Sequence, residues 1–153
     1  MNVLPENIVF PGRTLTGAGQ AKNLLAECAR YGRRGLLVHG RSLAAQGGLK
    51  LLLQDSPSGM AVETWQHAGG EPALADLDRL LATARKHQAD WIAGIGGGSV
   101  LDLAKASAGL FHALQTPEAY HNGAAIETPG LAFAAVPTTA GTGSEATANA
   151  VLT

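Results

Sequence analysis

The 153-residue sequence has one cysteine, no long apolar run and almost no excess of charge. The lone Cys28 excludes an internal disulfide framework and is compatible with a reducing compartment. Eleven basic against twelve acidic residues exclude the broad basic surface of nucleic-acid-binding proteins. No apolar run approaches the roughly 20 residues that cross a bilayer, and the N-terminus lacks the pattern of a signal peptide. We therefore expect a cytoplasmic protein with neither a nucleic-acid nor a membrane partner.

Glycine is abundant, with 20 residues, and several of them cluster in two short stretches. The hydrophobic fraction of 46% and the charged fraction of 15% are typical of a globular protein. A chain of this length forms one domain with a hydrophobic core. Clustered glycines, by contrast, indicate backbone that something approaches closely.

Short apolar segments alternate along the chain with segments of helical periodicity. Strands are expected at residues 7–10, 14–16, 35–38, 60–66, 91–95 and 131–136, with the start of another at 148–152. Helices are expected for about 12 residues after Gly19, at 43–54, from Pro72 onward and at 100–113, and residues 117–129 are expected to be irregular. This alternation predicts a Rossmann-like α/β fold, with a largely parallel sheet and helices on both faces.

The first glycine cluster joins a predicted strand to a predicted helix and reads Gly96-Gly97-Gly98-Ser99. A helix N-terminus offers free N–H groups and a positive dipole end to an anion, and glycine lets a diphosphate come close. Ser99 and Asp102 have the spacing of a capping box. The alternative is a glycine-rich connection without a ligand. The cluster matches neither the common Gly-x-Gly-x-x-Gly fingerprint nor a P-loop.

The second cluster follows the next predicted strand, from Pro137 to Glu145, and contains Thr138, Thr139, Thr142 and Ser144. Ligands of open α/β sheets gather at the carboxyl ends of the strands, so this loop is expected on the same edge as residues 96–99. Its hydroxyl groups can donate and accept hydrogen bonds. The alternative is that Thr142 or Ser144 only caps a short helix.

Together the two stretches, Gly96-Gly97-Gly98-Ser99-Val100-Leu101-Asp102-Leu103-Ala104-Lys105 and Pro137-Thr138-Thr139-Ala140-Gly141-Thr142-Gly143-Ser144-Glu145, resemble the iron-containing (group III) alcohol dehydrogenase family. The resemblance implies that residues 1–153 are a dinucleotide-binding domain for NAD(P)(H). It places Gly97, Gly98 and Ser99 around the pyrophosphate, and Thr138, Thr139 and Thr142 along the adenosine and nicotinamide-ribose side. Gly96 and Asp102 are further candidate cofactor-binding residues. Hydride would pass between the nicotinamide and an alcohol or its aldehyde or ketone.

The family resemblance also implies a divalent metal, Fe2+ or Zn2+, that polarises the substrate oxygen. The family's metal ligands belong to a following helical domain that these 153 residues do not contain. The chain has five histidines, and none of them matches a metal position of the family: His39, His67, His87, His112 and His121. We therefore expect a truncated chain without catalytic residues or metal ligands, inactive alone. Removing a packed domain would expose apolar surface, so a homo-oligomer is expected.

The cofactor preference is expected to depend on residues after the strand 35–38. Many NAD-preferring members of the family place an aspartate where this sequence has Gly40, and an acidic group there would repel a 2′-phosphate. Gly40 and Ser42 are therefore candidate cofactor-binding residues, and Arg41 offers a cation. We expect NADP(H) to be accepted, the alternative being that Arg41 is an ordinary surface charge.

Other interpretations remain open. A maleylacetate reductase, a glycerol dehydrogenase-like enzyme or a dehydroquinate synthase-like enzyme would share the nucleotide domain. The chain could also be a nucleotide-binding module without catalysis. The substrate and the metal are not indicated by the sequence.

Overall fold

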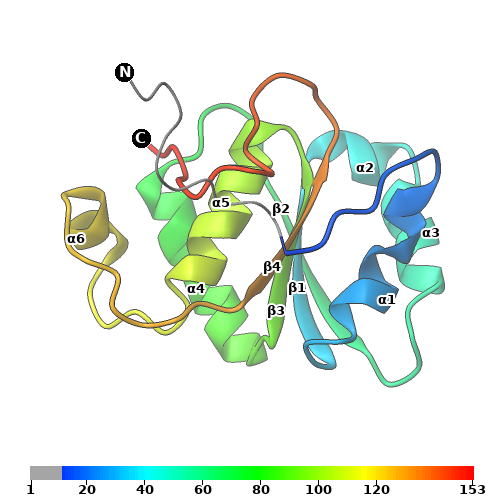
Figure 1. Ribbon diagram of the computed structural model, residues 1–153, viewed down its shortest axis with the longest axis horizontal. Coiled ribbons are helices and arrows are strands. Elements are labelled where there is room, and N and C mark those ends of the chain that lie inside the picture. Colours follow the sequence, from blue (N-terminus) through cyan, green and yellow to red (C-terminus); the bar gives the residue numbers. More distant parts are fainter. Residues whose placement is uncertain (1–11) are drawn as a thin grey trace, which may run out of the picture.

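A computed structural model describes residues 12–153 as a four-stranded parallel sheet with helices on both faces (Figure 1). The strands are β1 (Arg34–His39), β2 (Ala61–Gln66), β3 (Trp91–Gly96) and β4 (Ala132–Pro137). Their order in the sheet is β2-β1-β3-β4, and every neighbouring pair is parallel. The Rossmann-like prediction is confirmed.

The helices fall into two layers (Figure 1). One face of the sheet carries α4 (Leu74–His87) and α5 (Gly98–Gly109), and the other carries η1 (Gln20–Asn23), α1 (Leu24–Cys28), α2 (Arg41–Ala45) and α3 (Gly48–Gln54). The short α6 (Pro117–His121) lies outside these two layers, next to α4. Among the described residues, no helix is both long and apolar enough to span a membrane.

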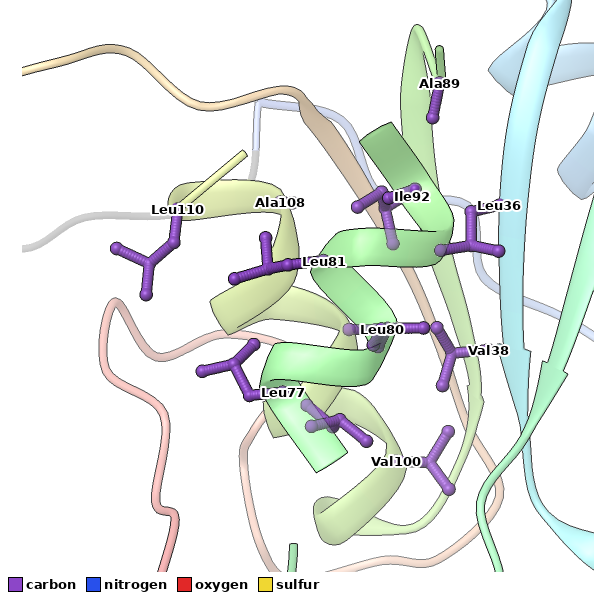
Figure 2. Close-up of a cluster of buried hydrophobic side chains, with 13 residues drawn as sticks. Leu36, Val38, Leu77, Leu80, Leu81, Ala89, Ile92, Val100, Ala108 and Leu110 are labelled. Atoms are coloured by element: carbon purple, nitrogen blue, oxygen red, sulfur yellow. The ribbon is translucent and has the colours of Figure 1, made fainter. Parts of the chain in front are cut away.

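A separate hydrophobic cluster lies under each helix layer. In the larger one, α4 and α5 pack on β1 and β3 through Leu36, Val38, Leu77, Leu80, Leu81, Ile92, Leu103 and Ala104, most of which Figure 2 shows. In the other, Leu24, Leu25 and Cys28 of α1 pack on Leu37, Trp91, Ala93 and Ile95. Central strands that are buried on both faces explain the continuous apolar runs of β1 and β3.

The indole of Trp91 occupies the space beside Gly35 of β1. A Cβ built at Gly35 would fall 1.9 Å from this ring, so only glycine leaves room for it. The indole Nε1–H donates to the carbonyl oxygen of Gly32 at 3.3 Å. Trp91 is consequently one of the largest fully buried side chains of the domain.

Several predicted elements differ from the structure. Residues 14–16 and 148–152 are not strands, and residues 7–10 lie outside the described part of the chain. The helix expected for 12 residues after Gly19 is a 3-10 turn followed by the five residues of α1. The segment 117–129 contains α6, where Thr116 accepts a hydrogen bond from Ala119 N–H and Pro117 occupies the first turn.

The helix predicted at 100–113 is α5, which begins two residues earlier and ends four earlier. Its end is fixed by the approach of the next segment. The N–H of Leu131 donates to the carbonyl oxygen of Ala108 at 2.9 Å, and a Cβ built at Gly130 would lie 2.5 Å from that oxygen. The chain entering β4 therefore takes up an acceptor that a longer helix would have used.

Candidate nucleotide-binding site

A recess lies at the carboxyl edge of the sheet, where the chain leaves two neighbouring strands in opposite directions. From β1 it runs through α2 and α3 on one face to β2, whereas from β3 it runs through α5 on the other face to β4. Such a switch point is where open α/β sheets bind their ligands. The recess has a volume of about 200 Å³ and is lined by Gly40, Arg41, His67, Gly69, Gly70, Gly97, Gly98, Ser99 and Val100.

The N-terminus of α5 opens into this recess. Gly97 is the N-cap, and none of the described side chains caps the helix. The N–H groups of Val100 and Leu101 both donate to the Gly97 carbonyl oxygen at 3.1 Å. The amides of Gly98 and Ser99 belong to the first turn, which has no intrahelical acceptors for them. They are available to an anion, as predicted, but the capping role of Ser99 and Asp102 is wrong.

The three glycines of this turn face different neighbours. A Cβ at Gly96 would fall 2.7 Å from the side chain of Val100, inside the fold. At Gly97 it would lie 3.3 Å from Thr139 Oγ1, and at Gly98 it would lie 3.0 Å from Thr142 Cγ2. The turn is therefore closed from behind by its own helix and flanked in front by the second glycine-rich loop.

The second loop lies on the same edge as the first, as predicted. In the sheet register Gly96 is paired with Pro137, and the N–H of Thr138 donates to the Gly96 carbonyl oxygen at 2.9 Å. Thr139 and Thr142 are exposed and contact the glycine turn, whereas Ser144 is buried. Thr142 Oγ1 accepts the N–H of Ser144 at 3.4 Å, but residues 144–146 form only a turn, so the interpretation that Thr142 or Ser144 caps a short helix is wrong.

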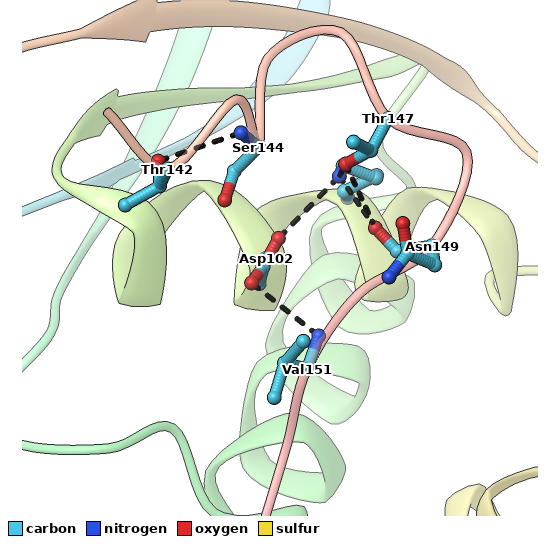
Figure 3. Close-up of polar contacts among 7 residues, drawn as sticks. Asp102, Thr142, Ser144, Thr147, Asn149 and Val151 are labelled. Atoms are coloured by element: carbon cyan, nitrogen blue, oxygen red, sulfur yellow. Dashed lines mark hydrogen bonds and ion pairs between the residues drawn. The ribbon is translucent and has the colours of Figure 1, made fainter. Parts of the chain in front are cut away.

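Asp102, a predicted site residue, points away from the recess toward the C-terminal segment (Figure 3). Its Oδ1 pairs with Lys105 Nζ at 3.4 Å, and its Oδ2 accepts the N–H of Val151 at 3.3 Å. Lys105 Nζ also donates to the carbonyl oxygen of Asn149 at 2.6 Å and to Thr147 Oγ1 at 3.1 Å. Both charged side chains are largely buried. They tie residues 147–151 to α5.

The end of β1 forms the opposite wall of the recess. Gly40 lines it in an extended conformation, φ −80° and ψ 168°. The Arg41 guanidinium lies over Gly69, with Nη2 2.8 Å from a Cβ built there. Ser42 is exposed and is not among the lining residues.

His67 is a lining residue that the sequence analysis missed. It is buried, stacks on Trp65 with ring centroids 6.3 Å apart, and its Nδ1 accepts the N–H of Gly69 at 3.3 Å. It directly follows β2, so the rule that ligands meet strand carboxyl ends would have found it.

Within residues 12–153, no three side chains of histidine, cysteine, aspartate or glutamate come together as a set of metal ligands. Two of the histidines are engaged with main-chain oxygens. His39 Nδ1 lies 2.9 Å from the Gly40 carbonyl oxygen, and His87 Nε2 lies 3.1 Å from that of Ala61. The residues described here therefore do not fit a divalent metal.

The family follows from comparison with known proteins. A sequence model described as "Iron-containing alcohol dehydrogenase" matches residues 11–153, nearly the whole chain. The chain belongs to the iron-containing alcohol dehydrogenase family. The resemblance carried by the two glycine-rich stretches is thus confirmed, and the matched region contains both sides of the recess.

Curated relatives are longer than this chain. The probable alcohol dehydrogenase EutG of Escherichia coli (strain K12) is 34% identical over 139 residues, which cover 90% of this chain and 35% of that protein. Long-chain-alcohol dehydrogenase 1 of Geobacillus thermodenitrificans is 33% identical, over 95% of this chain and 38% of that protein. The chain thus spans little more than a third of these family members.

Solved structures of the family have the same fold. Sulfoacetaldehyde reductase from Bifidobacterium kashiwanohense, in complex with NAD+, matches with a TM-score of 0.85 and 28% identity, over 98% of this chain and 40% of that one. An iron-containing alcohol dehydrogenase from Thermococcus thioreducens matches with a TM-score of 0.81 at 24% identity, over 96% of this chain and 41% of that one.

Proposed function

We propose that residues 1–153 are the NAD(P)-binding domain of a metal-dependent alcohol dehydrogenase. The observation that carries the proposal is the uncapped N-terminus of α5, which faces a recess at the switch point of the sheet. The family assignment supports it, as does the NAD+ in the complex of the related sulfoacetaldehyde reductase.

In this proposal the pyrophosphate lies against the amides of Gly98 and Ser99, where Gly97 leaves space for it. Thr138, Thr139 and Thr142 border it from the second loop and supply hydroxyl groups. Gly96 acts by allowing the turn itself, since a side chain there would meet Val100. Asp102 acts from behind, through the segment that it holds.

We further propose that the adenosine ribose lies at the end of β1 near Gly40 and Ser42, and that NADP(H) is accepted there. The absence of a carboxylate at Gly40 and the guanidinium of Arg41 over Gly69 support this preference. A relative named "Probable NADH-dependent butanol dehydrogenase 2", from Bacillus subtilis (strain 168), is 31% identical, so binding of NAD(H) is expected as well.

The reaction proposed for the protein is hydride transfer between the nicotinamide and an alcohol or its aldehyde or ketone. Relatives named for long-chain alcohols and for sulfoacetaldehyde support this broad class. The metal implied by the family, Fe2+ or Zn2+, would polarise the substrate oxygen when bound. The described residues of this chain act on the nucleotide and offer no ligand set for that metal.

We place the protein in the cytoplasm as a homo-oligomer. The single free and buried cysteine supports the first proposal, and exposed apolar side chains such as Leu51, Leu114 and Ile126 support the second. Light scattering during gel filtration tests the oligomer, because a monomer mass at micromolar concentration contradicts it.

Calorimetric titration of the 153-residue chain with NADPH and with NADH tests the central proposal. We expect saturable binding of one nucleotide per chain, with NADPH bound at least as tightly as NADH. A folded chain that binds neither nucleotide at millimolar concentration contradicts the function. Clear preference for NADH contradicts only the cofactor choice.

A further inference from the structure

The loop that faces the glycine turn has few fixed points of its own. Residues 138–142 are exposed, and Gly141 and Gly143 have φ of 118° and 67°, the left-handed region that glycine adopts most readily. The loop is fixed at its start by the bond from Thr138 N–H to the Gly96 carbonyl oxygen. Near its other end Ser144 is buried, and the N–H groups of Ala146 and Thr147 donate to the Gly143 carbonyl oxygen. The position of the loop over the turn therefore also depends on how the segment after this turn is held.

Lys105 holds that other end. Its Nζ donates to the Asn149 carbonyl oxygen at 2.6 Å and to Thr147 Oγ1 at 3.1 Å, and the Asp102 carboxylate lies 3.4 Å away. The side chains of Lys105 and Asp102 are only 13% and 11% exposed. The cost of burying an ion pair is offset only when the remaining donors and acceptors of both groups are satisfied, as these are by Thr147 Oγ1 and by the main chain of Asn149 and Val151 (Figure 3).

Lys105 stands too far along the helix to serve the anion itself. It lies six residues beyond Ser99, about 9 Å along the helix axis at 1.5 Å per residue. Its ammonium group is also occupied by the three oxygens of residues 102, 147 and 149. Any effect of Lys105 on nucleotide binding must act through the loop.

We propose that Asp102 and Lys105 are positioning residues for the nucleotide: by fastening residues 147–151 to α5, they hold Thr139 and Thr142 against the glycine turn. The inference rests on the proposed function, since it concerns the affinity of the same site. It assigns to the pair a role distinct from direct contact with the cofactor and from capping of α5.

The decisive variant removes both charges together, Asp102→Asn with Lys105→Gln. The asparagine Oδ1 can still accept the Val151 N–H, whereas the glutamine is shorter than lysine and uncharged. Removing both partners leaves no buried charge unpaired, so the fold is expected to be retained. Lys105→Met alone leaves Asp102 unpaired and destabilises the chain more. Lys105→Arg retains the charge and the donors.

Two measurements are made on the 153-residue chain. Hydrogen–deuterium exchange without nucleotide is expected to accelerate in residues 138–147 of the double variant and to remain slow in the core strands. The Kd for NADPH is expected to rise about tenfold in the double variant, because binding must then order a loop that is no longer anchored. Lys105→Arg keeps the charge and the donors, so this single variant is expected to bind NADPH with nearly wild-type affinity.

Lys86→Met, which removes an exposed lysine from α4, is the matched control and is expected to change neither measurement. A folded double variant with wild-type exchange in residues 138–147 overturns the positioning role, whether or not the chain binds nucleotide. Wild-type affinity in that variant also overturns it. Failure of the wild-type chain to bind either nucleotide contradicts the proposed function instead, and the exchange measurement still decides the anchoring.

Discussion

Three consecutive glycines at the end of β3 serve different purposes, although the sequence alone presents them as equivalent. The fold requires glycine at position 96, because the side chain of Val100 occupies the space that a Cβ would need. Gly97 has φ −77° and ψ −176°, an extended conformation open to any residue, and only the side chain of Thr139 lies near a Cβ built there. We propose that the space at Gly97 is left for the pyrophosphate.

Substitution of Gly97 by alanine is expected to preserve the fold and to weaken nucleotide binding. The methyl group occupies space proposed for the pyrophosphate, so the Kd for NADPH is expected to rise at least tenfold. The free energy of unfolding is expected to change by less than about 1 kcal/mol. Gly96→Ala, the comparison variant, is expected to lose about 1–3 kcal/mol of stability through overpacking against Val100. Equal affinity of Gly97→Ala and wild type, by calorimetry, contradicts the phosphate site.

Cofactor preference can be tested at Gly40. Its extended backbone accepts a side chain, and a Cβ there would have Val100 Cγ2 at 3.8 Å, an ordinary contact. Gly40→Asp is expected to weaken NADPH binding at least tenfold by repelling the 2′-phosphate, and to leave NADH binding nearly unchanged. Gly40→Asn has the same shape without the charge and is the matched control. An equal loss in both variants means that shape, not charge, is responsible.

Among the elements, α5 depends on its neighbours at both ends. Its N-terminus opens into the recess. The segment that directly follows its C-terminus is bonded from α4 by Arg85, which donates to the carbonyl oxygens of Leu110, Phe111 and Ala113 at 3.0, 3.0 and 3.3 Å. A cation at this end also complements the helix dipole. The helix that presents the glycine turn is thereby joined to the helix beside it.

Arg85→Met is expected to lower the free energy of unfolding by about 1–2 kcal/mol, because three carbonyl groups lose a charged donor. Urea denaturation measures the change. Arg79→Met removes an exposed arginine of the same helix, paired with Asp76 one turn away, and is expected to change stability by less than about 0.5 kcal/mol. Similar losses in both variants would show that Arg85 contributes only as a surface charge.

The elements recovered from the sequence are those whose signals are local. The apolar runs of β1 and β3 and the helical spacing of Leu77, Leu80, Leu81 and Ala84 in α4 reflect burial that each segment needs. The failures involve partners distant in sequence. Asp102 has the spacing of a capping residue, but its carboxylate accepts the N–H of Val151, 49 residues away. Residues 148–152 read as a strand, yet they lie along α5 instead of joining the sheet (Figure 3).

The candidate site was predicted to a similar extent. Both glycine-rich loops and their common edge follow from strand order and motif spacing. His67, Gly69 and Gly70 follow β2, so the same rule places them on this edge, but that their loop reaches the recess depends on the pairing of β2 with β1. Of the ten predicted site residues, Gly40, Gly97, Gly98 and Ser99 line the recess, whereas others, such as Asp102, are not among its lining residues.

At the scale of the whole molecule, Cys28 reports on the opening of the domain. It lies between α1 and the sheet, and burial, with a further contribution from the charge of Glu27, raises the pKa of its thiol to about 12. The unfolded thiol ionises near pH 9.0, while the buried one retains its proton. The free energy of unfolding is therefore expected to fall as the pH rises from 9 toward 12.

Labelling of Cys28 by a thiol reagent at pH 8 is expected to require unfolding. NADPH at one hundred times its Kd stabilises the folded chain by about 2.7 kcal/mol, so the labelling rate is expected to fall about 100-fold. A colorimetric disulfide reagent measures the rate. The chain in 6 M guanidinium is the control and is expected to react quickly with or without nucleotide. A native rate that does not respond to nucleotide means that α1 opens alone.

The two tryptophans of the chain give the domain two separate optical probes. Trp91 is sealed against Gly35 in the core, so its fluorescence emission is expected to shift to the red only when the chain unfolds. Trp65 stacks on His67 at the wall of the recess, so its quantum yield is expected to change when a nucleotide enters. A Trp65→Phe chain whose emission still responds to NADP+, which does not absorb at the emission wavelength of tryptophan, contradicts this division. Where it holds, one spectrum records folding and occupancy as independent signals.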